Sequence, residues 1–239
     1  MRINWNFIKS VLLLGLVVFL YAFSSYKNNS RLVSKVVVQF TGNENVYITT
    51  EMVDKLLIQN QEQLYILPKD NLDLKEMEIS LESDDMIKSA QVYLTVNGVV
   101  RAKIEQRRPI ARVNSKSIYY IDEDGFWMPL SPQHSARVPL VTGIVEKEHL
   151  KGVYKMALKI DKDPFLKTYV TEIHQTKNSE IRLKMRALDF EVLVGNLEDL
   201  NNKIKKFKAF YQKAKKDTML DVYKSVNLQF KNQVVCTKK

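Results

Sequence analysis

Residues 104–125 read IEQRRPIARVNSKSIYYIDEDG, and this stretch decides how the chain is divided. Pro109 has no N–H to give to a sheet ladder, so it belongs at a strand end or a bulge. Strand-like sequence lies on both sides of it, which predicts a junction between two β-rich regions. Asp124-Gly125, after an aromatic and β-branched run, is typical of a tight hairpin turn. No nucleophile, metal cluster or phosphate loop accompanies the stretch, which therefore indicates a scaffold rather than an active site.

The residues before the junction predict the order strand, helix, helix, strand, strand. Apolar and polar residues alternate over 36–41, and again on either side of Asn97-Gly98, the strongest short hairpin signal. Between these strands, Thr49 is placed to cap a helix that carries Met52, Val53, Leu56 and Leu57. Leu74, Met77 and Leu81 have the spacing of a second, shorter helix. We expect two helices on one face of a sheet whose other face is wet or used by a partner.

The residues after the junction predict a mixed β domain with two helices. The predicted strands are 118–121 and 126–128 around the turn, a short edge segment at 139–143, then 169–174, 180–186, 190–194 and 225–230. The predicted helices are 153–160, ending before Pro164, and 197–215. Seven lysines lie on the polar face of the second helix, and a solvated outer face is favoured over an anion or membrane site.

The N-terminal region contains one candidate membrane segment. Residues 11–23, VLLLGLVVFLYAF, form an apolar run with Trp5, Tyr21 and Tyr26 at aromatic-belt positions. Ser24-Ser25 makes a poor cleavage site, which favours an uncleaved anchor over a signal peptide. We therefore expect a short cytoplasmic tail at 1–9, a transmembrane helix at 10–26 and a single-pass protein. Basic residues flank both sides of the segment, so charge does not decide its orientation.

Composition leaves the type of partner open. The 37 Lys and Arg residues against 27 Asp and Glu give a net charge of +10, which suits either an anionic partner or general solubility. The single cysteine, Cys236, excludes an internal disulfide and is better read as a packing or edge residue than a nucleophile.

Signals of catalysis or metal binding are missing from the sequence. His134, His149 and His174 lie far apart, without a second ligand at helical spacing. The acidic run Asp122-Glu123-Asp124 lacks calcium-loop spacing, and a solvent-facing turn is the favoured interpretation. There is no GxSxG, HExxH or Walker loop. We expect no catalytic residue, no metal, no cofactor and no nucleic-acid partner.

The order of these pieces resembles the bacterial cell-division protein family FtsQ/DivIB. The resemblance is carried by the anchor, the strand-helix-helix-strand-strand module, Glu105-x-x-x-Pro109-x-Ala111 and Tyr120-Ile-Asp-x-x-Gly125. Residues 226–235, VNLQFKNQVV, look like the family's last-strand motif. Asn227-Leu228-Gln229-Phe230 stands where the family commonly has aspartate-leucine-arginine-tyrosine, so only backbone pairing carries over. The resemblance implies a POTRA-like domain at 33–106 and an FtsQ-type β domain at 107–239, an α+β protein overall.

The resemblance also implies a role. It implies a non-enzymatic divisome scaffold in the cytoplasmic (inner) membrane, with its bulk on the periplasmic or extracytoplasmic side, at the division septum. It implies that the β domain binds membrane-anchored partners of the FtsB/DivIC and FtsL type, and that the POTRA domain contacts other division proteins during septum formation. Another POTRA-containing envelope assembly or transport protein stays open as an alternative, as does, less favoured, a cell-wall-modifying enzyme.

The sequence places the docking edge at the last predicted strand. A terminal strand often lies at a sheet edge, where free N–H and C=O groups accept another chain. The candidate partner-binding residues are Tyr223, Ser225, Asn227, Leu228, Gln229 and Phe230.

Overall fold

The N-terminal segment is a long exposed helix. In the computed structural model, which describes residues 5–29, 33–42, 46–59, 72–146 and 150–239, helix α1 spans Trp5–Asn29. Within it, Phe7–Lys27 is long and apolar enough to cross a membrane. The transmembrane helix predicted at 10–26 falls inside this span. Residues 1–4 of the predicted tail lie outside the described residues, as does His149.

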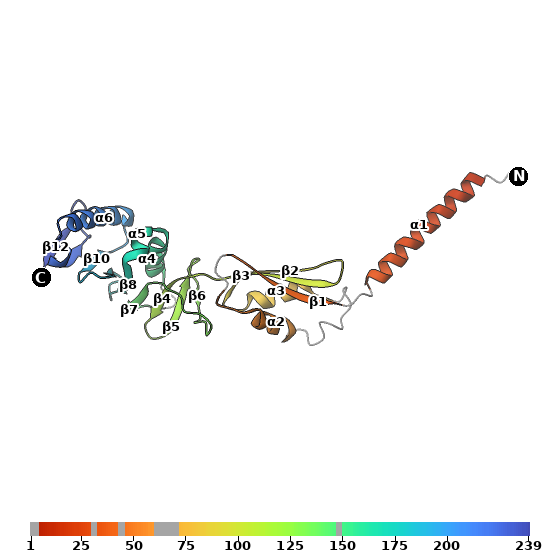
Figure 1. Ribbon diagram of the computed structural model, residues 1–239, viewed down its shortest axis with the longest axis horizontal. Helices are drawn as coiled ribbons and strands as arrows, with labels where there is room; N and C mark the ends of the chain where they lie inside the picture. Colours follow the sequence, from red (N-terminus) through yellow and green to blue (C-terminus); the bar gives the residue numbers. More distant parts are fainter. Residues whose placement is uncertain (1–4, 30–32, 43–45, 60–71, 147–149) are drawn as a thin grey trace. The chain divides into compact units, whose positions relative to one another are not determined.

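The chain divides into two compact units, Met1–Gln106 and Arg107–Lys239, and each has its own buried cluster of apolar side chains. The first unit contains β1 (Lys35–Thr41), α2 (Thr50–Gln59), α3 (Leu74–Glu82), β2 (Ile87–Leu94) and β3 (Val99–Gln106). Its sheet has the order β1-β3-β2, with β1 parallel and β2 antiparallel to β3. Helices α2 and α3 cover one face of it (Figure 1).

Local sequence explains the elements of the first unit. The Asp73 side chain accepts the N–H of Glu76 at 2.9 Å and caps α3, while Thr49 Oγ1 accepts the N–H of Met52 at the start of α2. Gly98, with φ +82°, closes the β2–β3 turn, a conformation that glycine adopts without strain. The predicted order of elements and the covered sheet face are confirmed.

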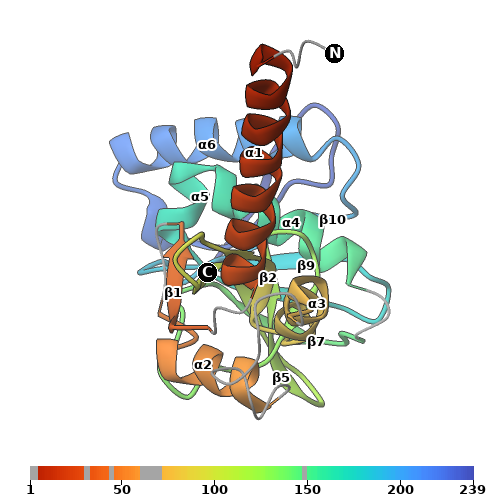
Figure 2. The ribbon, with the colours of Figure 1, turned by 90° about the vertical axis from the view of Figure 1, so that its right-hand side faces the viewer.

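The second unit is built on one nine-stranded sheet. Its strands are β4 (Pro109–Asn114), β5 (Ile118–Asp122), β6 (Trp127–Met128), β7 (Leu140–Gly143), β8 (Val170–Gln175), β9 (Ile181–Met185), β10 (Glu191–Gly195), β11 (Tyr223–Asn227) and β12 (Val235–Lys238). Their order is β12-β11-β10-β9-β8-β7-β4-β5-β6. Helices α4 (Lys151–Lys162), α5 (Pro164–Tyr169) and α6 (Leu200–Lys216) lie on one side of it (Figures 1 and 2), and a short 3₁₀ turn, η3 (Leu220–Val222), precedes β11.

Helix α5 adds a third helix to the two predicted for this unit. Asp163 ends α4 and its carboxylate accepts the N–H groups of Phe165 and Leu166, while Pro164 occupies the first helical position. A capping aspartate followed by proline is a helix start signal, so the predicted stop at Pro164 is at once the beginning of a new helix.

The segment predicted as a short edge strand at 139–143 lies inside the sheet, and the edge assignment is wrong. Strand β7 pairs in parallel with β4 on one side and with β8 on the other. A four-residue strand carries too little periodicity to distinguish an edge from the interior, and its neighbours are far away in sequence.

The solvent-facing turn predicted for the acidic run after the junction is wrong for Asp122, whereas Glu123 is half-buried and Asp124 is exposed. The Asp122 side chain is 1% exposed, because one carboxylate oxygen pairs with Arg107 at 2.8 Å while the other accepts the N–H groups of Asp124 and Phe126. Next to it, Arg108 bonds Glu123 at 3.0 Å and Asp161 through two nitrogens. The arginines before Pro109 therefore fix the β5–β6 turn and α4 within the second unit.

Candidate partner-binding surface

The strand predicted as the docking edge is not at the edge of the sheet, and that placement is corrected here. Strand β11 pairs in parallel with β10 and antiparallel with β12, so both of its sides are occupied. The N–H of Leu228 donates to the Leu193 carbonyl at 2.9 Å within the same sheet. A proline at Leu228 would consequently break the fold rather than report on a partner.

The six candidate residues have different surroundings. Leu228 is fully buried, and Tyr223 packs edge-on against Phe210 at 5.3 Å between ring centroids. The Asn227 side chain accepts the N–H of Gln229, whose own amide lies 3.3 Å from Glu180. Ser225 pairs with Thr237 of β12. Of the six, Phe230 exposes the largest apolar surface, with 46% of the residue accessible.

The outer strand at this end is β12, which sequence reasoning missed. Because Lys239 N donates to the Val222 carbonyl and residues alternate along an antiparallel strand, Thr237 and Val235 direct their N–H groups to β11. Cys236 and Lys238 then direct theirs to the open side. Lys238 is exposed, and half-burial of Cys236 raises the pKa of its thiol, so this strand offers backbone groups rather than a reactive side chain.

The opposite edge of the same sheet is much less suited to pairing. Strand β6 has two residues, and Pro129 follows it directly. Short edge strands and prolines are features that discourage edge-to-edge pairing. Among the described strands of this sheet, β12 is the one that combines an end position with a four-residue length.

In the first unit, one sheet edge is closed by a helix. The outward N–H groups of Ala90 and Val92 on β2 donate to the carboxylates of Glu82 and Glu78 on α3, at 3.1 and 2.9 Å. These carboxylates occupy the positions that a partner strand's carbonyls would take. Strand β1 forms the other edge and pairs with β3 alone among the described strands.

The lysine-rich face of α6 is partly structural. Lys203 is buried and donates to the Val194 carbonyl, the Asn196 carbonyl and the Asn196 side chain at 2.8–3.0 Å. Lys206 donates to two carbonyls of the β11–β12 connection, and Lys208 pairs with Asp163 at 2.6 Å. The solvated face predicted from sequence is therefore limited to Lys205, Lys213, Lys215 and Lys216.

Within the described residues, no group of three or more His, Cys, Asp and Glu side chains is placed to hold a metal ion. Of the three histidines considered above as metal ligands, His174 contacts Thr142 Oγ1 at 2.9 Å, and the same hydroxyl donates to Glu172 at 2.7 Å. These side chains lie on the sheet face opposite the helices, where Lys184 also pairs with Glu172. They form a cross-strand polar cluster on a sheet surface.

Comparison with known proteins gives consistent matches for both units. A family model described as FtsQ/DivIB, C-terminal related, matches residues 108–237, and one described as a POTRA-like domain matches residues 33–105. The Cell division protein FtsQ of Geotalea daltonii is 22% identical over 179 residues, which cover 70% of this chain and 64% of that protein. The chain thus spans less than two thirds of the length of this curated relative.

Proposed function

Since this chain belongs to the FtsQ/DivIB family of cell-division proteins, we propose that it is a non-enzymatic, membrane-anchored scaffold of the division machinery. The family match covers the second unit, and α1 supplies a segment able to anchor it in a membrane. The proposal places α1 in the cytoplasmic membrane, the two units on the extracytoplasmic side and the protein at the septum.

The docking site in this proposal is the open side of β12. A partner strand added there would gain main-chain hydrogen bonds with Cys236 and Lys238, and its alternate side chains would meet exposed β12 side chains such as Val235 for specificity. The proposed partners are membrane-anchored division proteins of the FtsB/DivIC and FtsL type. The open four-residue edge, whose first three residues lie within the family-matched region, is the observation that carries the proposal.

A single proline tests the docking edge. Lys238→Pro removes an N–H that points away from β11, so the β11–β12 ladder keeps its bonds while a partner strand loses one and meets the proline ring. We expect the dissociation constant of the full-length protein for its co-purified partner to rise at least about tenfold. Lys238→Ala, which removes the side chain and keeps the N–H, is the matched control.

Equal affinity of the Lys238→Pro variant and the wild type, with unchanged circular dichroism, would reject β12 as the docking edge. The division role is tested separately by the position of a fluorescent fusion in dividing cells. We expect rings at midcell, and a uniform envelope signal would argue for a different envelope role. The two experiments fail independently, because a division protein can dock its partners elsewhere.

A further inference from the structure

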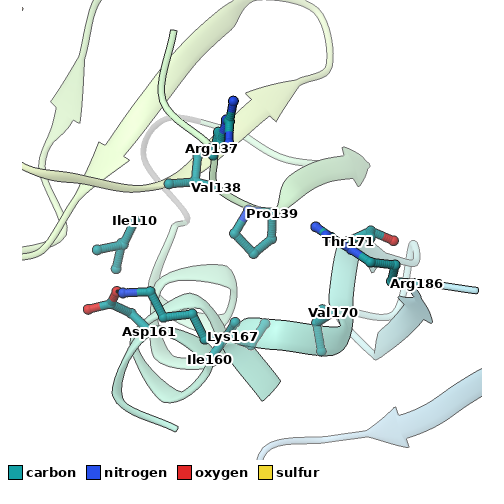
Figure 3. A pocket seen from close by; sticks show the side chains of 10 residues that line it. All are labelled: Ile110, Arg137, Val138, Pro139, Ile160, Asp161, Lys167, Val170, Thr171 and Arg186. Carbon is teal, nitrogen blue, oxygen red and sulfur yellow. The ribbon is translucent and has the colours of Figure 1, made fainter. Parts of the chain in front are cut away.

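A small pocket lies at one end of the second unit's sheet, where β7 and β8 begin and β9 ends (Figure 3). Its volume is about 220 Å³, and its lining residues are Ile110, Arg137, Val138, Pro139, Ile160, Asp161, Lys167, Val170, Thr171 and Arg186. Small-molecule and cofactor sites usually exceed about 300 Å³. The pocket is therefore sized for one or two side chains of a peptide rather than for a cofactor.

The inner lining of the pocket is apolar and buried. Ile110, Ile160 and Val170 are each at most 4% exposed and belong to the buried cluster of the unit. Pro139 lies at the centre of the view in Figure 3, and its carbonyl accepts the N–H of Arg112. An apolar side chain that entered here would be removed from water on several sides.

The charged groups around this lining leave an excess of positive charge. Asp161, the one carboxylate, already bonds two nitrogens of Arg108 at 3.1 and 2.7 Å and the Lys167 ammonium at 2.9 Å. In the described part of the chain, no side chain forms an ion pair or hydrogen bond with the guanidinium of Arg137 or of Arg186. The lining thus carries three cations, Arg137, Lys167 and Arg186, and one carboxylate that is already paired.

The backbones that carry the two unpaired arginines are held in place. Arg186 directly follows β9, and its backbone N–H donates to the Tyr169 carbonyl. The backbone N–H of Ala136, the residue before Arg137, donates to the Tyr120 hydroxyl at 3.1 Å. In Figure 3 the Arg186 side chain extends towards Pro139, whereas Arg137 stands at the rim and points outward. Arg186 is therefore the cation best placed to meet a group inside the pocket.

We propose that this pocket binds a partner peptide through an acidic residue next to an apolar one. A guanidinium presents its donors in a planar fork that matches a carboxylate, and the apolar lining receives the neighbouring side chain. An anionic lipid surface or a phosphate polymer would use the cations and leave that lining without a role. Strands β9, β10 and β11 separate β8 from β12, so this surface is additional to the proposed docking edge.

The proposal is tested by direct binding to the full-length protein in detergent micelles. The probe is the acetylated, amidated peptide Gly-Leu-Glu-Phe-Glu-Gly with a fluorescent label, and its counterpart has glutamine in place of both glutamates. We expect saturable binding of the acidic probe in fluorescence anisotropy. The affinity falls at least about tenfold for the glutamine probe and for the Arg186→Gln protein, because each loses the charged pair.

Arg182→Gln is the matched control, since Arg182 is an exposed arginine on β9, four residues before the exposed Arg186, and does not line the pocket. We expect it to bind like the wild type, with the same circular dichroism for both variants. Absence of saturable binding, or equal binding of the two probes, would overturn the proposal. The proposal would also be overturned if inorganic phosphate or phosphatidylglycerol vesicles displaced the labelled probe as well as the unlabelled acidic peptide does. Displacement by phosphate would identify a general anion site, and displacement by the vesicles a lipid surface.

Discussion

At Lys203, the packing of the aliphatic stem can be tested separately from the hydrogen bonds of the ammonium group. Its ammonium is buried against three oxygen acceptors at the end of β10, and this burial lowers the pKa of the amine. Lys203→Met keeps the aliphatic stem but removes the ammonium that donates to the Val194 and Asn196 carbonyls.

We expect Lys203→Met to lower the free energy of unfolding by about 2 kcal/mol, since buried acceptors lose a charged donor. Urea unfolding of the protein measures this difference. Lys205→Met, on the exposed side of the same helix, is the control and is expected to change stability by less than about 0.5 kcal/mol. Equal effects of the two substitutions would contradict a structural role for the Lys203 ammonium.

Protonation of the Asp161 carboxylate is expected to lower the free energy of unfolding in acid. Hydrogen bonds from Arg108 and Lys167 lower its pKa from 3.8 to about 2, and its side chain is 13% exposed. Because the folded state holds the proton less tightly, the stabilisation is complete above about pH 4 and is lost as the pH falls towards 2. A shift of this size corresponds to about 2 kcal/mol.

The matching experiment compares the free energy of unfolding of the wild type and Asp161→Asn from pH 5 to pH 2. The variant is expected to be less stable at pH 5, and the two curves should converge at the acid end, since the asparagine has no proton to gain. Parallel curves over this range would show that Asp161 does not titrate as its contacts indicate.

Strand β2 shows how an element can be protected at an edge. Two glutamates one turn apart on α3 accept the outward N–H groups of Ala90 and Val92. We expect the double variant Glu78→Ala, Glu82→Ala to lose about 2 kcal/mol, because two charge-assisted bonds to part-buried donors disappear. Amide exchange at Ala90 and Val92 should accelerate, whereas Glu78→Gln, Glu82→Gln, which keeps an acceptor oxygen at each place, should restore part of the protection.

Strands and helices with a long periodic pattern were predictable, and short elements were not. Residues 36–41, 90–104 and 197–215 carry enough alternation or helical spacing to define β1, the β2–β3 hairpin and α6. Strands β7 and β12 have four residues each, and their pairing depends on neighbours that no local pattern specifies. The same limit explains why the docking edge was placed on β11, one strand too far inside the sheet.

Charged side chains at the candidate sites were the other limit of sequence reasoning. Asp122 reads as a turn residue because its neighbours are Glu123 and Asp124, yet Arg107, fifteen residues earlier, pairs with it in the interior. The burial of a charged side chain cannot be predicted from its sequence neighbours when the group that compensates the charge is distant in the chain. Arg186 likewise looks like an ordinary exposed residue until Arg137 and Asp161 are seen at the same pocket.

The boundary between the two units is the peptide bond between Gln106 and Arg107, and the side chains on its two sides bond to different units. Gln106 is buried in the first unit, where its amide accepts the N–H of Tyr47 and donates to the Ile48 carbonyl. Arg107 and Arg108 bond Asp122 and Asp161 in the second. A break placed even two residues late would therefore remove contacts that the second unit needs.

This gives a prediction for the molecule as a whole, tested with two fragments that differ at their first residues. Residues 107–239 retain Arg107 and Arg108, whereas residues 109–239 begin at Pro109 and leave the buried Asp122 carboxylate without its cation. Loss of one partner from a buried pair costs about 3 kcal/mol, or roughly 10 °C in a unit of this size. Differential scanning calorimetry measures the difference. The Arg107→Met variant of the 107–239 fragment, which keeps Arg108, separates the effect of the buried Arg107–Asp122 pair from that of the part-buried Arg108 contacts. Equal melting temperatures for the two fragments would show that the arginines before Pro109 are not part of the second unit's fold.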